Sequence, residues 1–217
     1  MFRIVTVERE YGCGGGDIAA EIAQRLGWKL WDQTLTQEIA KLANVDCRAV
    51  ERCDEKVDST FYRLAKVFWR GSYERSIPLP DAEAFDADCM VSMMERLAAR
   101  IAEEGNAVVV GRGSPFFLRD RSDTFSVFLY ADRQEKIHRL VQGGETSANA
   151  EELIDTVDQE RKTFIKHYFN AEWPTRSLYD LMLNCGMGDR NVIETILETM
   201  RRVEATHAAV ELSVRRS

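Results

Sequence analysis

The feature that most limits the fold is a short apolar segment, followed at once by a glycine-rich turn and then by a helical pattern. Residues 2–7 read FRIVTV, residues 11–16 read YGCGGG and residues 17–26 read DIAAEIAQRL. The β-branched and apolar residues of the first segment favour a buried strand. Apolar residues recur every four positions in the third, which is typical of one helix face. The sequence therefore predicts a strand, a tight turn and a helix in succession.

Strands and helices alternate along the rest of the chain. Further strands are expected at 28–32, 106–110, 123–131 and 179–186, and helices at 33–75, 87–104, 132–140, 153–169 and after Asp189, with a loop at 76–86 and a polar break at 142–153. This alternation predicts an α/β fold in which helices cover both faces of a parallel sheet. Ligands of such sheets bind at the carboxyl ends of the strands. Glycine-containing turns at 12–16, 111–113 and 186–188 follow three of these strands.

Composition narrows the class of protein. With 36 acidic and 29 basic residues the net charge is −7, which argues against a broad nucleic-acid or anionic-membrane surface. No apolar run approaches the roughly 20 residues that span a bilayer. The five cysteines form no C-x-x-C pair and the three histidines are scattered, so no metal site is expected. Reduced thiols and a cytoplasmic location are the simplest interpretation.

The first glycine-rich turn has the pattern of a phosphate-binding loop, because glycines let backbone amides converge on phosphate oxygens. When Gly14 is aligned with the second glycine of G-x-x-x-x-G-K-[ST], Gly15 replaces the lysine and Gly16 the hydroxyl residue. A tight turn without a ligand is the alternative. The candidate phosphate-binding residues are Gly12, Cys13, Gly14, Gly15, Gly16 and Asp17.

Two arginines follow strands and are candidates to bind phosphate, since the planar guanidinium matches phosphate oxygens. Arg9 precedes the glycines, and its alternative is a surface salt bridge with Glu8 or Glu10. Arg112 lies between two glycines, and its alternative is the capping of a carboxylate.

A third group of charges lies on the helix expected at 153–169. Its members are Asp158, Glu160, Arg161, Lys162 and Lys166, and Arg139 on the preceding helix raises the same question. Such a run is usually a solvated helix face. The functional interpretation is a lid that brings cations over a triphosphate.

Several ordered motifs together resemble the bacterial cytidylate kinase-like family. They are VTVEREYGCGGGDIAAEIAQRLGWKLWDQTL, VVVGRGSPFFL, VFLYADRQEKIHRL, DQERKTFIKHYF and YDLMLNCG, and the resemblance runs from about residue 3 to about residue 203. It implies a P-loop NTPase-type, three-layer α/β/α domain over residues 1–217. The core would comprise 1–32, 106–141 and 177–206, with a helical NMP-binding region at 33–105 and a short lid at 142–172.

The resemblance also implies an activity, which is transfer of the γ-phosphoryl group of ATP to CMP or dCMP with Mg²⁺. By position, residues 12–17 would hold the donor phosphates, and Asp32 and Arg112 would bind the acceptor. Arg139 and Arg161 would close over the transferring group, and Asp158 would orient one of them. In an active kinase, Arg9, Arg112, Arg139 and Arg161 would jointly replace the missing lysine. The implied partner is therefore a small-molecule nucleotide, not a nucleic acid or a membrane.

The chain departs from the family pattern at two positions. It has Gly16 where arginine is common and Glu8 where serine is common. Three hypotheses follow: an active kinase, a nucleotide- or phosphate-binding protein on the same fold, and a kinase for another small acceptor. Gln37 and Asp58 are possible readers of the acceptor base, and the aromatic segment FYRLAKVFW is a candidate for homo-oligomer contacts.

Overall fold

A five-stranded parallel sheet forms the centre of the computed structural model, which describes residues 1–32 and 87–214. The strand order is β2-β3-β1-β4-β5, and each neighbouring pair is parallel. The strands are β1 (Ile4–Arg9), β2 (Lys29–Trp31), β3 (Ala107–Val110), β4 (Thr124–Tyr130) and β5 (Leu181–Asn184). The expected parallel sheet is therefore confirmed.

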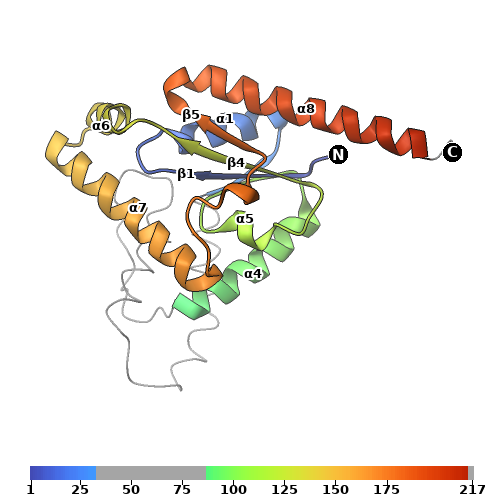
Figure 1. The fold of residues 1–217 in the computed structure, drawn as a ribbon, viewed down its shortest axis with the longest axis horizontal. Coiled ribbons are helices and arrows are strands. Elements are labelled where there is room, and N and C mark those ends of the chain that lie inside the picture. The colour runs from blue at the N-terminus through green and yellow to red at the C-terminus, as the bar shows by residue number, and fades with distance from the viewer. Residues whose placement is uncertain (33–86, 215–217) are drawn as a thin grey trace.

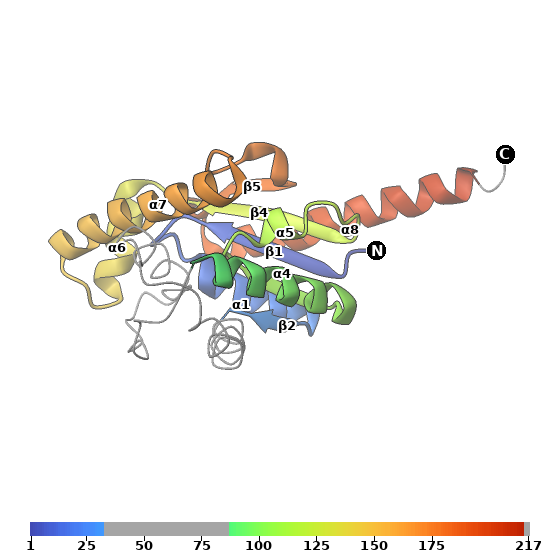
Figure 2. The same ribbon diagram turned by 90° about the horizontal axis from the view of Figure 1, so that it is seen from below.

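Helices cover both faces of the sheet, and Figure 1 shows the three layers. The helices are α1 (Gly15–Leu26), α4 (Ala87–Glu104), α5 (Ser114–Phe117), α6 (Arg133–Gln142), α7 (Ser147–Phe169) and α8 (Asp189–Val214), with short 3₁₀ turns η2 (Arg176–Leu178) and η3 (Cys185–Met187). Apolar residues of α1 and α8 form one core with the sheet. Those of α4, α5 and α7 form the core on the opposite face, which Figure 2 shows from below. The fold is thus the three-layer α/β/α type.

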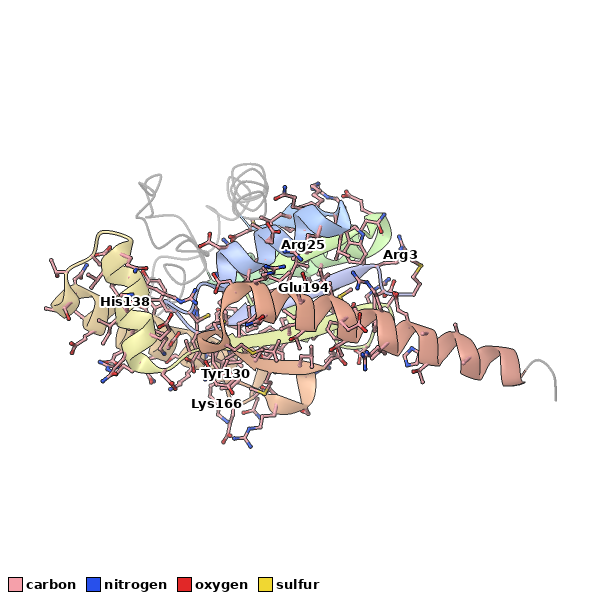
Figure 3. The ribbon with its side chains drawn as sticks, turned by 90° about the horizontal axis from the view of Figure 1, so that it is seen from above. Arg3, Arg25, Tyr130, His138, Lys166 and Glu194 are labelled. Atoms are coloured by element: carbon pink, nitrogen blue, oxygen red, sulfur yellow. The ribbon has the colours of Figure 1, made fainter. Side chains whose placement is uncertain are left out.

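The first helix and the last helix are tied together across their outer surfaces. Arg25 of α1 donates a hydrogen bond to Glu194 of α8 at 2.6 Å, and Figure 3 shows the two side chains side by side. Beyond Met200, which is buried, α8 extends past the sheet, and most side chains at 201–209 are exposed. Its inner half therefore belongs to the core, whereas residues 201–209 of its outer half lie largely outside it.

One element begins earlier than the sequence predicts. Residues 142–153 are expected to form a polar break, but α7 already starts at Ser147. The side chain of Thr146 caps it by accepting a hydrogen bond from the Asn149 N–H at 3.2 Å. Ala150 and Ile154 then lie buried against Leu140 in a small third core. The polar composition of the segment thus conceals an apolar helix face.

Several expectations fall outside the described residues. They are the helical region at 33–75, the loop at 76–86, the possible base readers Gln37 and Asp58, and the aromatic segment FYRLAKVFW. The expected helix at 87–104 is α4, with Met94, Leu97 and Ile101 buried. In the described part of the chain, no helix has both the length and the apolar composition to cross a membrane.

Candidate functional site

The carboxyl ends of three neighbouring strands bring most of the candidate residues together. The glycine-rich turn follows β1, Asp32 follows β2, and the segment Gly111–Arg112–Gly113 follows β3. Because β1 pairs with β3 and β3 pairs with β2, these turns lie at the same edge of the sheet. This is the edge at which parallel sheets bind their ligands.

Gly14, in the phosphate-loop candidate, has a backbone conformation that favours glycine. This residue is the N-cap of α1 and has a φ of 80°, in the left-handed region that side chains disfavour. A Cβ atom at Gly14 would also collide with Nη1 of Arg139. The glycine is therefore required twice, for its backbone angle and for the approach of a guanidinium. Asp17 lies in the first turn of α1 and is exposed.

Arg139, on α6, directs one guanidinium nitrogen at this loop. Its Nε donates to Glu135 at 2.8 Å and its Nη2 donates to Asp189 at 2.8 Å. The hydrogen bond to Asp189, followed by that to Glu135, raises the pKa of Arg139, so the group stays charged. Within the described residues Nη1 has no hydrogen-bond partner. A cation thus lies beside the loop where a loop lysine is missing.

Asp32 and Arg112, the two expected acceptor-binding residues, are in direct contact. Nη1 of Arg112 lies 3.2 Å from Oδ1 of Asp32, and both side chains are buried. Arg112 has a φ of 57°, which is uncommon for a residue with a side chain. The pair is the carboxylate contact that the sequence left open as an alternative. It also places both acceptor-binding candidates at one point.

Arg9 is buried, so the surface salt bridge expected as its alternative is wrong. Only 5% of the residue is exposed, and burial, followed by the positive charge of Arg161, lowers its pKa to about 10. Glu10 turns away and accepts a hydrogen bond from Lys136 at 2.9 Å. The Arg9 side chain runs between two glycines: its Cβ lies 2.9 Å from where a Gly15 Cβ would be, and its Nη1 would meet a Cβ on Gly111.

The charged helix contributes two buried residues to the same place. Nη1 of Arg161 donates to the Arg9 carbonyl oxygen at 2.8 Å and to Asp158 Oδ1 at 3.1 Å. Asp158 also accepts a hydrogen bond from the backbone N–H of Tyr11 at 2.9 Å. Lys162 and Lys166, in contrast, are exposed. The charge run therefore divides into a solvated face and a buried face that contacts the loop.

Arg9, Arg112 and Arg161 form a buried group that is called the arginine cluster below. Each of the three is at most 8% exposed. Burial is the main cause that lowers the pKa of both Arg9 and Arg112, and the positive charge of Arg161 also lowers each pKa, whereas Asp32 raises both. Contacts with Asp32 and Asp158 offset part of this positive charge, so the cluster offers an anionic ligand oriented guanidinium donors.

Sequence reasoning assigned no role in this site to two charged residues that the fold brings here. Lys136 is buried against Gly12, and its Nζ lies 3.6 Å from Asp158 as well as 2.9 Å from Glu10. Glu8 is 3% exposed, accepts a hydrogen bond from the Gly113 N–H and adds a negative charge beside the arginine cluster. A charged residue at the end of an apolar strand, as Glu8 is, was the available signal.

The residues present fit a polyphosphate group. The left-handed glycine at the start of α1, the Nη1 atom of Arg139 and the arginine cluster all favour phosphate oxygens. In the described ranges, no group of three or more His, Cys, Asp or Glu residues could hold a metal ion. Magnesium commonly binds through substrate phosphates with only one or two carboxylates. An ion carried by the nucleotide is compatible with this site.

The parallel sheet with helices on both faces is a kinase-like fold of the type found in shikimate kinase and gluconokinase. The sequence profile of the cytidylate kinase-like family matches residues 4–186, so the chain belongs to that family. No curated protein matches the chain.

Solved structures with low sequence identity share the fold. An uncharacterized protein from Eubacterium ventriosum is 17% identical, with a TM-score of 0.66 over 93% of this chain and 99% of that one. A gluconokinase from Sinorhizobium meliloti is 14% identical, with a TM-score of 0.53 over 94% of each chain. Shikimate kinase from Acinetobacter baumannii, in complex with shikimate, is 12% identical, with a TM-score of 0.51 over 93% and 94%.

Proposed function

We propose that the chain is a nucleoside monophosphate kinase-like phosphotransferase that uses ATP and Mg²⁺ to phosphorylate CMP or dCMP in the cytoplasm. The observation that carries this proposal is the convergence of the arginine cluster and Asp32 beside the glycine-rich turn. Family membership supports it, since the family is described as cytidylate kinase-like.

Each candidate residue has a role in this proposal. The backbone of Gly12, Cys13, Gly14, Gly15, Gly16 and Asp17 holds the donor phosphates. Arg112, oriented by Asp32, binds the acceptor phosphate. Arg9, Arg139 and Arg161 neutralise charge on the transferring group, and Asp158 fixes Arg161. An acceptor oxygen bonds to the γ-phosphorus as the bond to the bridging β,γ-oxygen breaks, and ADP leaves.

A panel of acceptors tests the proposal. Incubation with ATP, Mg²⁺ and each nucleoside monophosphate is expected to yield ADP and the nucleoside diphosphate, fastest with CMP or dCMP. Product formation is measured by chromatography of the nucleotides. If ATP binds but no acceptor in the panel is phosphorylated, the proposed transfer is wrong.

The second candidate function is a nucleotide- or phosphate-binding protein on the same fold. It is favoured by the glycines at positions 15 and 16, because the loop itself then carries neither a lysine nor a hydroxyl group. Phosphoryl transfer depends mainly on positioning and on charge neutralisation. Each ~1.4 kcal/mol of lost transition-state stabilisation lowers the rate about tenfold. Tight ATP binding without turnover is the result that separates this function from the first.

A further inference from the structure

One oxygen of the Glu8 carboxyl is buried with no hydrogen-bond partner among the described residues. This atom, Oε2, belongs to a residue of which only 3% is exposed. The Gly113 N–H donates to the same carboxyl, and Oε1 would lie 3.5 Å from a Cβ on Gly111. The carboxyl is therefore anchored on one side only. Buried polar atoms nearly always have a partner, so an unmet oxygen calls for an explanation.

The surroundings of Glu8 are strongly charged. It precedes Arg9 at the end of β1 and lies beside Phe128 in the register of β1 with β4. The charged and titratable groups that face it are Arg9 of β1, Arg112 of the turn after β3, Arg161 of α7 and Tyr179 after η2. Burial, followed by the charge of Glu8, raises the pKa of Tyr179. Two members of the arginine cluster already contact other carboxylates, Arg112 with Asp32 and Arg161 with Asp158.

These contacts create a conflict for an anionic ligand. A dianion attracted by the arginine cluster would come close to the Glu8 carboxyl, whose second oxygen has no donor to offset its charge. Like charges that share a buried site disfavour ionisation of the weaker acid. A proton on Oε2 removes the repulsion and gives the ligand a hydrogen-bond donor instead.

We propose that the arginine cluster binds the dianionic oxygens of a phosphoryl or sulfate group together with one proton, which Glu8 takes up. Glu8 is then a specificity-determining residue of the acceptor site. A nucleoside monophosphate, whose phosphate is a dianion, binds with proton uptake, whereas a neutral hydroxyl acceptor binds without it. The idea rests on the anion-binding part of the proposed function and not on phosphoryl transfer.

Burial raises the pKa of Glu8, against the lowering effect of the neighbouring arginines. The Glu8 carboxyl therefore takes up a proton at a pH closer to neutral than an exposed glutamate does. Because binding and protonation are reciprocally linked, a ligand that favours the protonated form must bind more tightly as the pH falls.

Sulfate is a suitable probe, because it stays a dianion over the pH range of interest. Its binding to the full chain is measured by titration calorimetry between pH 5 and pH 9, in pairs of buffers that differ in ionisation enthalpy. We expect the affinity for sulfate to fall by up to tenfold for each unit by which the pH rises. Proton uptake is expected to approach one proton per bound sulfate within that range. Absence of sulfate binding, or binding without proton uptake at every pH, would overturn the proposal.

Variants assign the proton to a residue. Glu8→Gln keeps a hydrogen-bonding side chain that cannot titrate, so it is expected to bind sulfate with no proton uptake and with a flat pH profile. Glu21→Gln removes the same charge from an exposed site on α1 and is expected to keep the uptake of the parent chain. Equal uptake by Glu8→Gln and the parent chain would assign the proton to another group and refute the role of Glu8.

The wild-type measurement still decides the matter if Glu8→Gln does not fold. In that case Glu8→Ser, which places the family's common residue at this position, replaces it. Failure of the proposed function looks different: the acceptor panel shows no product while sulfate binding remains coupled to a proton.

Discussion

The guanidinium of Arg112 contacts Asp32, which is the other candidate for acceptor binding. Arg112→Ala is expected to weaken CMP binding by about 10- to 100-fold, since hydrogen bonds to charged groups contribute roughly 1.5–3 kcal/mol. Binding is measured by calorimetry, and circular dichroism checks that the fold persists.

Arg112→Lys is the matched control, because it keeps the charge and loses the planar fork. An intermediate loss is expected for it. If Arg112→Ala binds the acceptor as tightly as the parent chain, Arg112 does not belong to the acceptor-binding site.

Glu8 should affect stability as well as binding. Its pKa is raised from the ordinary value of 4.5 by burial, so the folded state holds the proton more strongly than the unfolded chain. Its favourable contribution is therefore complete below about pH 4.5 and is lost as the pH rises through the folded-state pKa. Glu8→Gln is expected to raise the thermal midpoint at pH 8 and to lose this advantage near pH 4.5. Thermal unfolding of both chains between pH 4.5 and pH 8 measures the difference in thermal midpoint. A difference in favour of Glu8→Gln that grows as the pH falls would contradict this prediction.

The two buried charges missed from the sequence show what local pattern reasoning lacks at the residue scale. Lys136 lies in a segment that is mostly polar, and its burial results from Gly12 and α7, which are distant in sequence. Arg112 was predicted as a site residue because its flanking glycines are adjacent to it. Local sequence thus indicates which residue types are unusual, whereas burial depends on partners that only the fold brings near.

At the scale of elements, the two ends of α1 offer a controlled comparison. Gly14 and Gly27 are its caps, and both have left-handed backbone angles. Alanine at either position is expected to destabilise the fold by about 1–2 kcal/mol, the usual cost of that conformation. A Cβ at Gly14 would displace Arg139, whereas a Cβ at Gly27 meets nothing within 4 Å.

Only Gly14→Ala is therefore expected to weaken ATP binding, by tenfold or more. Fluorescent-nucleotide titration of both variants, alongside thermal unfolding, measures this. Equal losses of ATP affinity in the two variants would show that helix stability, not the contact with Arg139, controls the site.

Most elements could be predicted because their apolar pattern is local. The strands and α4 are examples, with Met94, Leu97 and Ile101 recurring along one face. The start of α7 was missed because Ala150 is small and its neighbours are polar, so the contact with Leu140 decides the helix boundary. The lid role of residues 142–172 and the domain division remain predictions.

At the scale of the whole molecule, burial along α8 predicts where stability resides. Ile196 is fully buried, so Ile196→Ala is expected to cost about 2–5 kcal/mol. Removal of the chain after Thr206 deletes the side chains at 207–209, which are exposed. This truncation also keeps Glu204, which accepts a hydrogen bond from the Phe2 N–H at 2.5 Å.

The free energy of unfolding of the truncated chain is expected to lie within about 1 kcal/mol of that of the full chain, because changes at exposed positions usually have small effects. Chemical denaturation measures both variants. A large loss on truncation, together with a change in sedimentation, would instead indicate that the outer half of α8 is a contact between copies of the chain.

The bonds that α7 makes to the turn after β1 have a consequence for how this protein tolerates change. Asp158 binds the main-chain N–H of Tyr11, and Arg161 binds the main-chain oxygen of Arg9. Neither bond depends on the identity of the side chain it reaches. A library that randomises Asp158 and Arg161 should therefore yield few clones whose turn keeps its position, although both residues are distant from the turn in sequence. The geometry of this turn is thus specified partly by residues 147 and 152 positions downstream of their partners in it, so a redesign of the turn has to preserve one face of α7 as well as the turn's own glycine and buried side chains.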